Sequence, residues 1–306
     1  MESVKPAPHL IKDTITFHLN TQLTTGLVLN GDYKSKVQFD LKSYVNLDDD
    51  DVEYCTVSMP NCVMTNSNYI VNDYNHQMTL TIGGNHQNWK IPNGNYTRAT
   101  WTAYMQIQLD LAYSAKYFVI SSDNTTNKFT ITVTPLFTAT YPGIFWGFGK
   151  YADPGFTTCD YIWGFRGFFA TTATSYTMDR VYNFLPIPRF VFHCNILSSG
   201  VTLNSNGVGS TDVLAVVPNS SKLNSQIIYE NSTTTILVKS NATVSNIVIT
   251  ITDDDNRLIN FNGISAYFDL QFNIFRKSLL RPLKFSKLVQ KAGETAGQYE
   301  NIVVGE

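Results

Sequence analysis

The stretch NIVITITDDDNRLINFNGISAYFDLQFNI, residues 246–274, decides the fold. Polar and apolar residues alternate through 246–253 and again through 266–274, as in strands that bury one face. Three aspartates and an asparagine, residues 253–256, separate the two segments and favour a turn. The stretch predicts a hairpin of two antiparallel strands with a short strand added in its connection.

The same alternation extends outward over most of the chain. It recurs at 14–20, 27–30, 36–41, 52–60, 77–82, 116–121, 128–133, 189–197, 213–218, 226–230 and 234–240. Only residues 97–111 have helical spacing, with Trp101, Met105 and Leu109 on one face. The sequence therefore predicts an all-β protein, a single jelly-roll β-sandwich of two antiparallel sheets with one short helix and long loops, spanning residues 14–275.

Composition excludes several classes of protein. Charged residues make up 15% of the 306 positions and aromatic residues 13%, which argues against disorder and coiled coil. A net charge of −2 argues against a non-specific nucleic-acid binder. No apolar stretch is long enough to span a membrane. Residues 1–13 resemble an extended arm and contain no signal-peptide pattern, so we expect synthesis in the cytosol.

The residue types that usually build catalytic and metal sites are scattered along the sequence. Histidines are isolated, no strand pairs two carboxylates, and the phosphate-binding motifs are missing. The sequence thus predicts no enzyme, no cofactor and no metal site. Cys55, Cys62, Cys159 and Cys194 are expected to be reduced and buried, with two disulfides as the alternative. The acidic runs at 48–53 and 253–255 are interpreted as a solvated loop and a turn, although cation binding stays open.

Two segments depart from the strand pattern. Residues 141–170 are rich in aromatic residues and glycine and form either an irregular loop anchored in the core or a partner surface. The candidate interface aromatics are Phe145, Trp146, Phe148, Tyr161, Trp163 and Phe165. Residues 276–306 are predicted to form a basic C-terminal extension, either a solvated tail or a docking arm. Its candidate docking residues are Arg276, Lys277, Arg281, Lys284, Lys287 and Lys291.

Several segments together resemble one protein family. These segments are WKIPNGNYT (89–97), FHCNIL (192–197), STDVLAVVP (210–218), IIYE (227–230), IVITITDDDNRLINFNG (247–263) and AYFDLQFNI (266–274). Their order resembles the penton, or vertex, capsid proteins of virophages and Polinton-like viruses, Mavirus-type members above all, over about residues 77–110 and 185–275.

The resemblance implies an upright jelly roll, five copies of which form a homopentamer at each fivefold vertex of an icosahedral virion. It implies a structural protein without catalytic residues, located in the virion and assembled in the host cytoplasm. The implied partners are further copies of the chain and the major capsid protein. The basic charge of the C-terminal segment separately suggests internal acidic material as a partner. The alternative is a jelly-roll carbohydrate-binding or host-attachment module. A glycosidase on this fold is disfavoured because paired carboxylates are missing.

Overall fold

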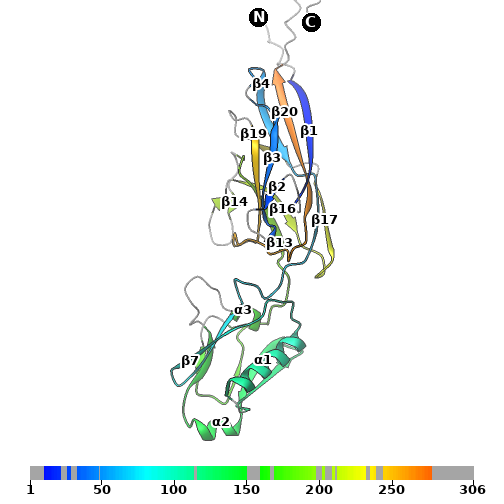
Figure 1. The fold of residues 1–306 in the computed structure, drawn as a ribbon. Coiled ribbons are helices and arrows are strands. Elements are labelled where there is room, and N and C mark those ends of the chain that lie inside the picture. The colour runs from blue at the N-terminus through cyan, green and yellow to red at the C-terminus, as the bar shows by residue number, and fades with distance from the viewer. Residues whose placement is uncertain are drawn as a thin grey trace, which may run out of the picture.

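The structure is a computed structural model that describes most of the chain. The described residues are 10–21, 26–28, 33–47, 49–113, 116–149, 159–165, 169–197, 202–203, 209–210, 212–231, 235–238 and 244–277. They form a tall β-sandwich and a separate group of helices and strands at one end of it (Figure 1). No described helix is long and apolar enough to cross a membrane.

The first sheet is built around the last strand. Its strands are β1 (Leu10–Asn20), β4 (Val52–Ser58), β5 (Asn61–Thr65), β17 (Gln226–Glu230), β18 (Ile236–Leu237) and β20 (Tyr267–Lys277). On one side, β20 pairs with β1 from Leu10↔Lys277 to Asn20↔Tyr267. On its other side it pairs with β4 and then β5, which act as one strand interrupted at Pro60. β17 and β18 extend the sheet from β5 and β4.

The second sheet completes the jelly roll. It consists of β2 (Gly26–Val28), β3 (Lys36–Val45), β13 (Arg189–Cys194), β16 (Val213–Pro218) and β19 (Val244–Thr252), in the order β16-β13-β19-β3-β2. A small pair, β14 (Thr202–Leu203) and β15 (Gly209–Ser210), lies outside both sheets. If β4/β5 and β17/β18 each count as one strand and β2 is left aside, the two sheets contain eight strands, which can be numbered 1 to 8 in chain order. The first sheet then has the order 1-8-3-6 and the second the order 2-7-4-5. This order of strands is a jelly roll, which confirms the predicted fold class.

Apolar side chains of both sheets meet in the sandwich interior. Phe268 of β20 packs edge-on against Phe39 of β3 and Phe192 of β13, with ring centroids 5.9 and 5.8 Å apart. The predicted turn after β19 is also confirmed, because Asp253 Oδ1 accepts the backbone N–H groups of Asp255 and Arg257. The predicted hairpin is wrong, because its two strands, β19 and β20, are central strands of opposite sheets and do not pair with each other.

Residues 66–188, between β5 and β13, form a separate group of elements. Its strands are β6 (Gln77–Ile82), β7 (Asn85–Lys90), β8 (Phe118–Asp123), β9 (Lys128–Val133), β10 (Trp146–Gly149), β11 (Phe169–Thr171) and β12 (Ser175–Thr177), and its helices are α1 (Arg98–Tyr113), α2 (Pro135–Thr140) and α3 (Asp160–Trp163). The strands make two sheets, β11-β10-β6-β7 and β12-β9-β8. The predicted helix is confirmed as α1, with Trp101, Met105 and Leu109 buried. We call residues 66–188 the insertion.

The insertion has its own hydrophobic core. Buried apolar residues between Ile70 and Met178 form one cluster, and those of the sandwich strands form another. The sequence assigns the strands at 77–82, 116–121 and 128–133 to the sandwich, whereas the structure groups the corresponding β6, β8 and β9 in the insertion. Alternation identifies strands but says nothing of which strands pair.

Candidate functional site

The base of the predicted C-terminal extension lies in the sandwich. Arg276 donates from Nε to Asp13 at 2.9 Å and from Nη1 to Asp49 and Asp51 at 3.0 and 2.7 Å. Lys277 lies 3.1 Å from Glu53. The carboxylates of Asp49 and Asp51 therefore bind a guanidinium of the same chain. The hydrogen bond with Asp49 is the main reason that the pKa of Arg276 is raised.

Asp48 of the acidic run at 48–53 lies outside the described part of the chain, and so do four of the six candidate docking residues, namely Arg281, Lys284, Lys287 and Lys291. Their docking role stays a prediction.

Four of the six candidate interface aromatics at 141–170 are buried. Trp146, Phe148, Trp163 and Phe165 are buried in the insertion core. Phe148 stacks on Trp163 with ring centroids 6.0 Å apart. Burial narrows the candidate interface aromatics to Phe145 and Tyr161, whose exposed fractions are 39% and 40%. Residues 150–158 and 166–168 of the segment lie outside the described residues.

Histidine and cysteine side chains have structural surroundings. His193, buried in β13, lies 3.0 Å from Asp212 and 2.9 Å from Thr252, as expected of a satisfied core histidine. The four cysteines are free and buried, which confirms the prediction of buried thiols. Across the described ranges, no three His, Cys, Asp or Glu side chains are arranged to hold a metal ion.

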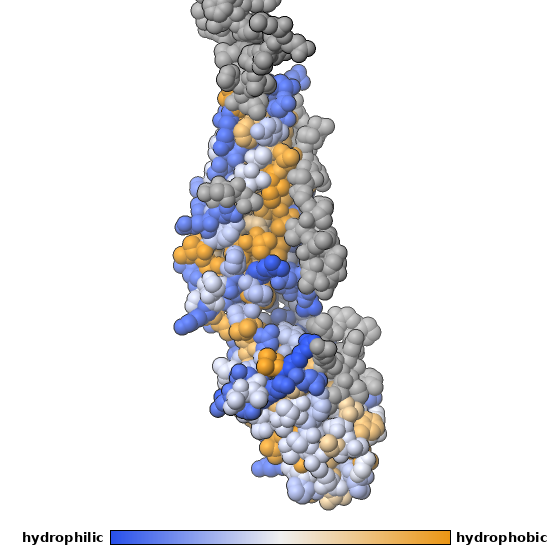
Figure 2. Space-filling view, turned by 180° about the vertical axis from the view of Figure 1, so that it is seen from behind, coloured by the Kyte–Doolittle hydropathy of each residue, from blue (hydrophilic) through white to orange (hydrophobic). Residues whose placement is uncertain are grey.

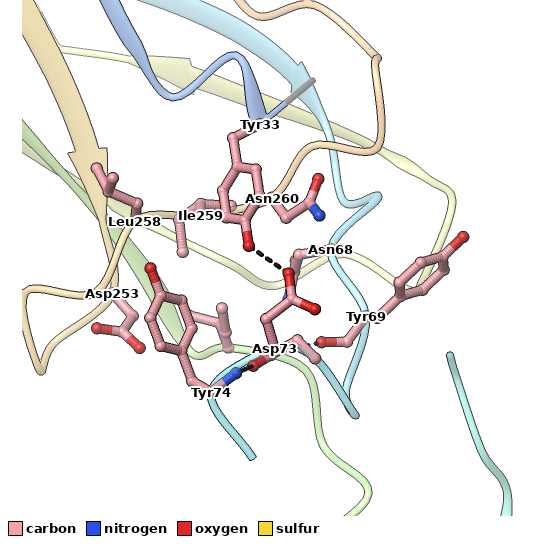
Figure 3. A pocket seen from close by; sticks show the side chains of 11 residues that line it. Tyr33, Asn68, Tyr69, Asp73, Tyr74, Asp253, Leu258, Ile259 and Asn260 are labelled. Atoms are coloured by element: carbon pink, nitrogen blue, oxygen red, sulfur yellow. Dashed lines mark hydrogen bonds between the residues drawn. The ribbon is translucent and has the colours of Figure 1, made fainter. Parts of the chain in front are cut away.

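The junction between insertion and sandwich brings polar side chains together from both parts (Figure 3). Tyr33 of the sandwich donates its hydroxyl hydrogen to Asp73 of the insertion, and Asn93 donates to the other oxygen of Asp73 at 2.7 Å. These bonds lower the pKa of Asp73, while burial is the main cause that raises the pKa of Tyr33. Ser67 donates to the Phe261 carbonyl at 2.8 Å, so several polar contacts join the two parts.

Two cavities adjoin these contacts. The inner one, about 20 Å³, is lined by Tyr33, Asn68, Asp73 and Asn260, among others. The outer one is an open groove of about 520 Å³. Both are lined by Tyr69, Asn72, Tyr74, Ile187 and Asp253, so they are adjacent.

Aspartates gather along the groove. Asp254 pairs with Arg189, and Asp255 lies 3.3 Å from Arg257. Burial raises the pKa of Asp253. Among the groove residues, sequence reasoning identified the aspartate turn at 253–255 and Tyr161, a candidate interface aromatic. Tyr33 and Asp73 come from distant segments, and no spacing rule connects them.

Comparisons with known proteins found similarity to solved structures. No family model matches the chain, and no curated protein sequence does. The structure is similar to that of the mavirus penton protein, with 16% identity and a TM-score of 0.42, over 87% of this chain and 99% of that one. It is also similar to a chain in the structure of the Sputnik virophage, with 10% identity and a TM-score of 0.36, over 88% of this chain and 99% of that one.

Proposed function

We propose that this chain is a structural penton subunit, five copies of which close a fivefold vertex of an icosahedral virion. The segments that resemble penton proteins support the proposal through their place in the fold. Residues 185–275 supply five of the eight jelly-roll strands, namely β13, β16, β17/β18, β19 and β20. Residues 77–110 supply β6, β7 and most of α1.

The molecule has two different ends. Leu10 and Lys277, where the described sandwich strands begin and end, pair with each other. The start of β1 and the end of β20 lie at the end of the sandwich farthest from the insertion (Figure 1). In an upright vertex subunit, the basic C-terminal segment would then face the interior and the insertion would face outward. This orientation fits a partner such as the major capsid protein or internal acidic material below the vertex.

The observation that carries the proposal is exposed apolar surface at opposite edges of one sheet. Ile11, on the edge strand β1, is 54% exposed, and Ile228, on β17 at the other edge, is 65% exposed. Apolar side chains also form a band along the sandwich in the view from behind (Figure 2). A closed ring uses a heterologous interface in which one flank meets the opposite flank of the next copy. Exposed apolar side chains on both flanks suit that contact.

The experiment is the oligomeric state of the purified full chain. Mass-resolved chromatography, with and without the major capsid protein, should show a pentamer whose population rises with concentration. Stable dimers or tetramers would contradict the vertex assignment. Labelling of assembled particles should then locate the chain at the vertices.

A further inference from the structure

The groove at the junction has the dimensions of a ligand site. Its volume of about 520 Å³ falls in the range of roughly 300–1,000 Å³ typical of sites for small molecules. It lies where two separately packed cores meet, and such boundaries often hold ligands. The inner cavity adjoins it on the side of Tyr33 and Asp73 (Figure 3).

The groove offers apolar surface to a ligand. Leu185 lines it and is 76% exposed, the most exposed large apolar side chain of the described residues. Tyr161, which accepts a hydrogen bond from Asn75, adds a partly exposed ring. Tyrosine rings give a ligand a flat apolar face with a polar tip.

The charges of the groove select against anions. Four aspartates, Asp160 and 253–255, line it together with one arginine, Arg257. Phosphate, sulfate or carboxylate groups would be repelled there. Hydroxyl groups would instead donate charge-assisted hydrogen bonds to the aspartates.

A buried amide marks the inner end. Asn68 is 2% exposed, and neither polar atom of its side chain has a hydrogen-bond partner among the described residues. An unpaired buried amide is unfavourable unless a bound group satisfies it. The adjoining cavity of about 20 Å³ accommodates one hydroxyl group or one water molecule.

We propose that the groove binds a neutral oligosaccharide. Sugar hydroxyls donate to Asp253 and its neighbours, and the C–H face of a sugar ring lies on Tyr161 and Leu185. One hydroxyl enters the inner cavity beside Asn68. Of the candidate interface aromatics at 141–170, only Tyr161 takes part in this site, and Trp146, Phe148, Trp163 and Phe165 are buried. The proposal does not depend on the capsid role.

The test measures binding to the purified full chain by ligand-observed NMR and calorimetry. The probes are cellohexaose, mannohexaose and chitohexaose as neutral sugars, heparin hexasaccharide and 3′-sialyllactose as anions, and hexalysine as a cation. Leu185→Arg places a cation across the groove at an exposed position, so it should not disturb the core. Leu111→Arg, at a residue of α1 that is 69% exposed and does not line the groove, is the matched control.

We expect at least one neutral hexasaccharide to bind and neither anion to do so. Leu185→Arg should weaken binding at least about tenfold, while Leu111→Arg leaves it unchanged and both variants melt as the parent does. The proposal is overturned if no neutral sugar binds at millimolar concentration, or if binding is insensitive to Leu185→Arg. It is equally overturned if hexalysine alone binds at this position, which would make the groove a peptide site.

Discussion

Arg276 donates from Nη1 to Asp51 at 2.7 Å, although the two residues are 225 positions apart in the sequence. The same guanidinium also binds Asp13, on β1, and Asp49. It therefore connects the first and last strands of the sandwich with the loop before β4. The acidic run and the start of the basic segment, which look like two separate features in the sequence, neutralise each other at this end of the molecule.

Removing this guanidinium should destabilise the sandwich. In Arg276→Gln, three carboxylates lose a shared cation and repel one another, so we expect the free energy of unfolding to fall by about 1 kcal/mol near neutral pH. Lys277→Gln, which removes one exposed pair, should have almost no effect. Urea unfolding of both variants measures the difference, which should shrink in 1 M salt, where the Debye length is about 3 Å. Equal effects of the two substitutions would refute the network.

The thiols should be inert in the folded protein. Burial raises the pKa of Cys55 to about 11 and that of Cys62 to about 12. Each thiol has a higher pKa in the folded protein than in the unfolded one. The stability that this difference contributes is complete below the pKa of the unfolded thiol and is lost as the pH rises towards the pKa of the folded thiol. Native protein at pH 8 should therefore react slowly with a disulfide reagent. After denaturation without reductant and with air oxidation blocked, titration should find four thiols; two missing equivalents would indicate a disulfide.

The sequence predicted local features of the fold well. Strands around 246–274, the helix at 97–111 and the turn at Asp253 depend on periodicity or on hydrogen bonds between near neighbours, and both can be seen in a sequence. The partners of Arg276 and the packing of Trp163 depend on contacts between distant segments. The junction between insertion and sandwich was missed for the same reason.

The insertion should fold without the sandwich, and the sandwich without the insertion. Each has its own buried core, and Tyr69 and Pro186, near the ends of the insertion, line the same groove. Replacing residues 69–186 by a short Gly/Ser linker should keep the β circular dichroism and a cooperative thermal transition. Melting should occur a few degrees lower, since Tyr33 loses Asp73. Residues 66–188 expressed alone should also melt cooperatively. Loss of both transitions would show that the two cores are interdependent.

A charge at the edge of the first sheet should prevent ring formation. Ile228→Arg changes an exposed side chain, so the monomer should melt as the parent does. In the proposed ring that position is covered by the next copy, and an unpaired charge there is unfavourable. We expect self-association to weaken at least about tenfold, measured by sedimentation over a range of concentrations. Leu111→Arg is the control, and equal association of the two variants would exclude β17 from the interface.

The last prediction concerns the C-terminal segment after β20. Its remaining bases alternate with apolar residues, a pattern that a merely solubilising tail does not need; the apolar residues are Leu279, Leu280, Leu283, Phe285 and Leu288. Deleting residues 279–306 keeps Arg276 and Lys277 in their ion pairs, so the melting temperature should change little. Incorporation into particles should fall, because the deletion removes both the charges and the apolar residues that would contact neighbouring capsid proteins or acidic material.

A charge variant separates these two contributions. Replacing Arg281, Lys284, Lys287 and Lys291 by glutamine keeps the apolar residues, so a loss equal to that of the deletion assigns the docking to charge. Incorporation is measured as the ratio of this chain to the major capsid protein in purified particles. If the truncated chain enters particles as efficiently as the full chain, the segment has no docking role and acts as a solvated tail.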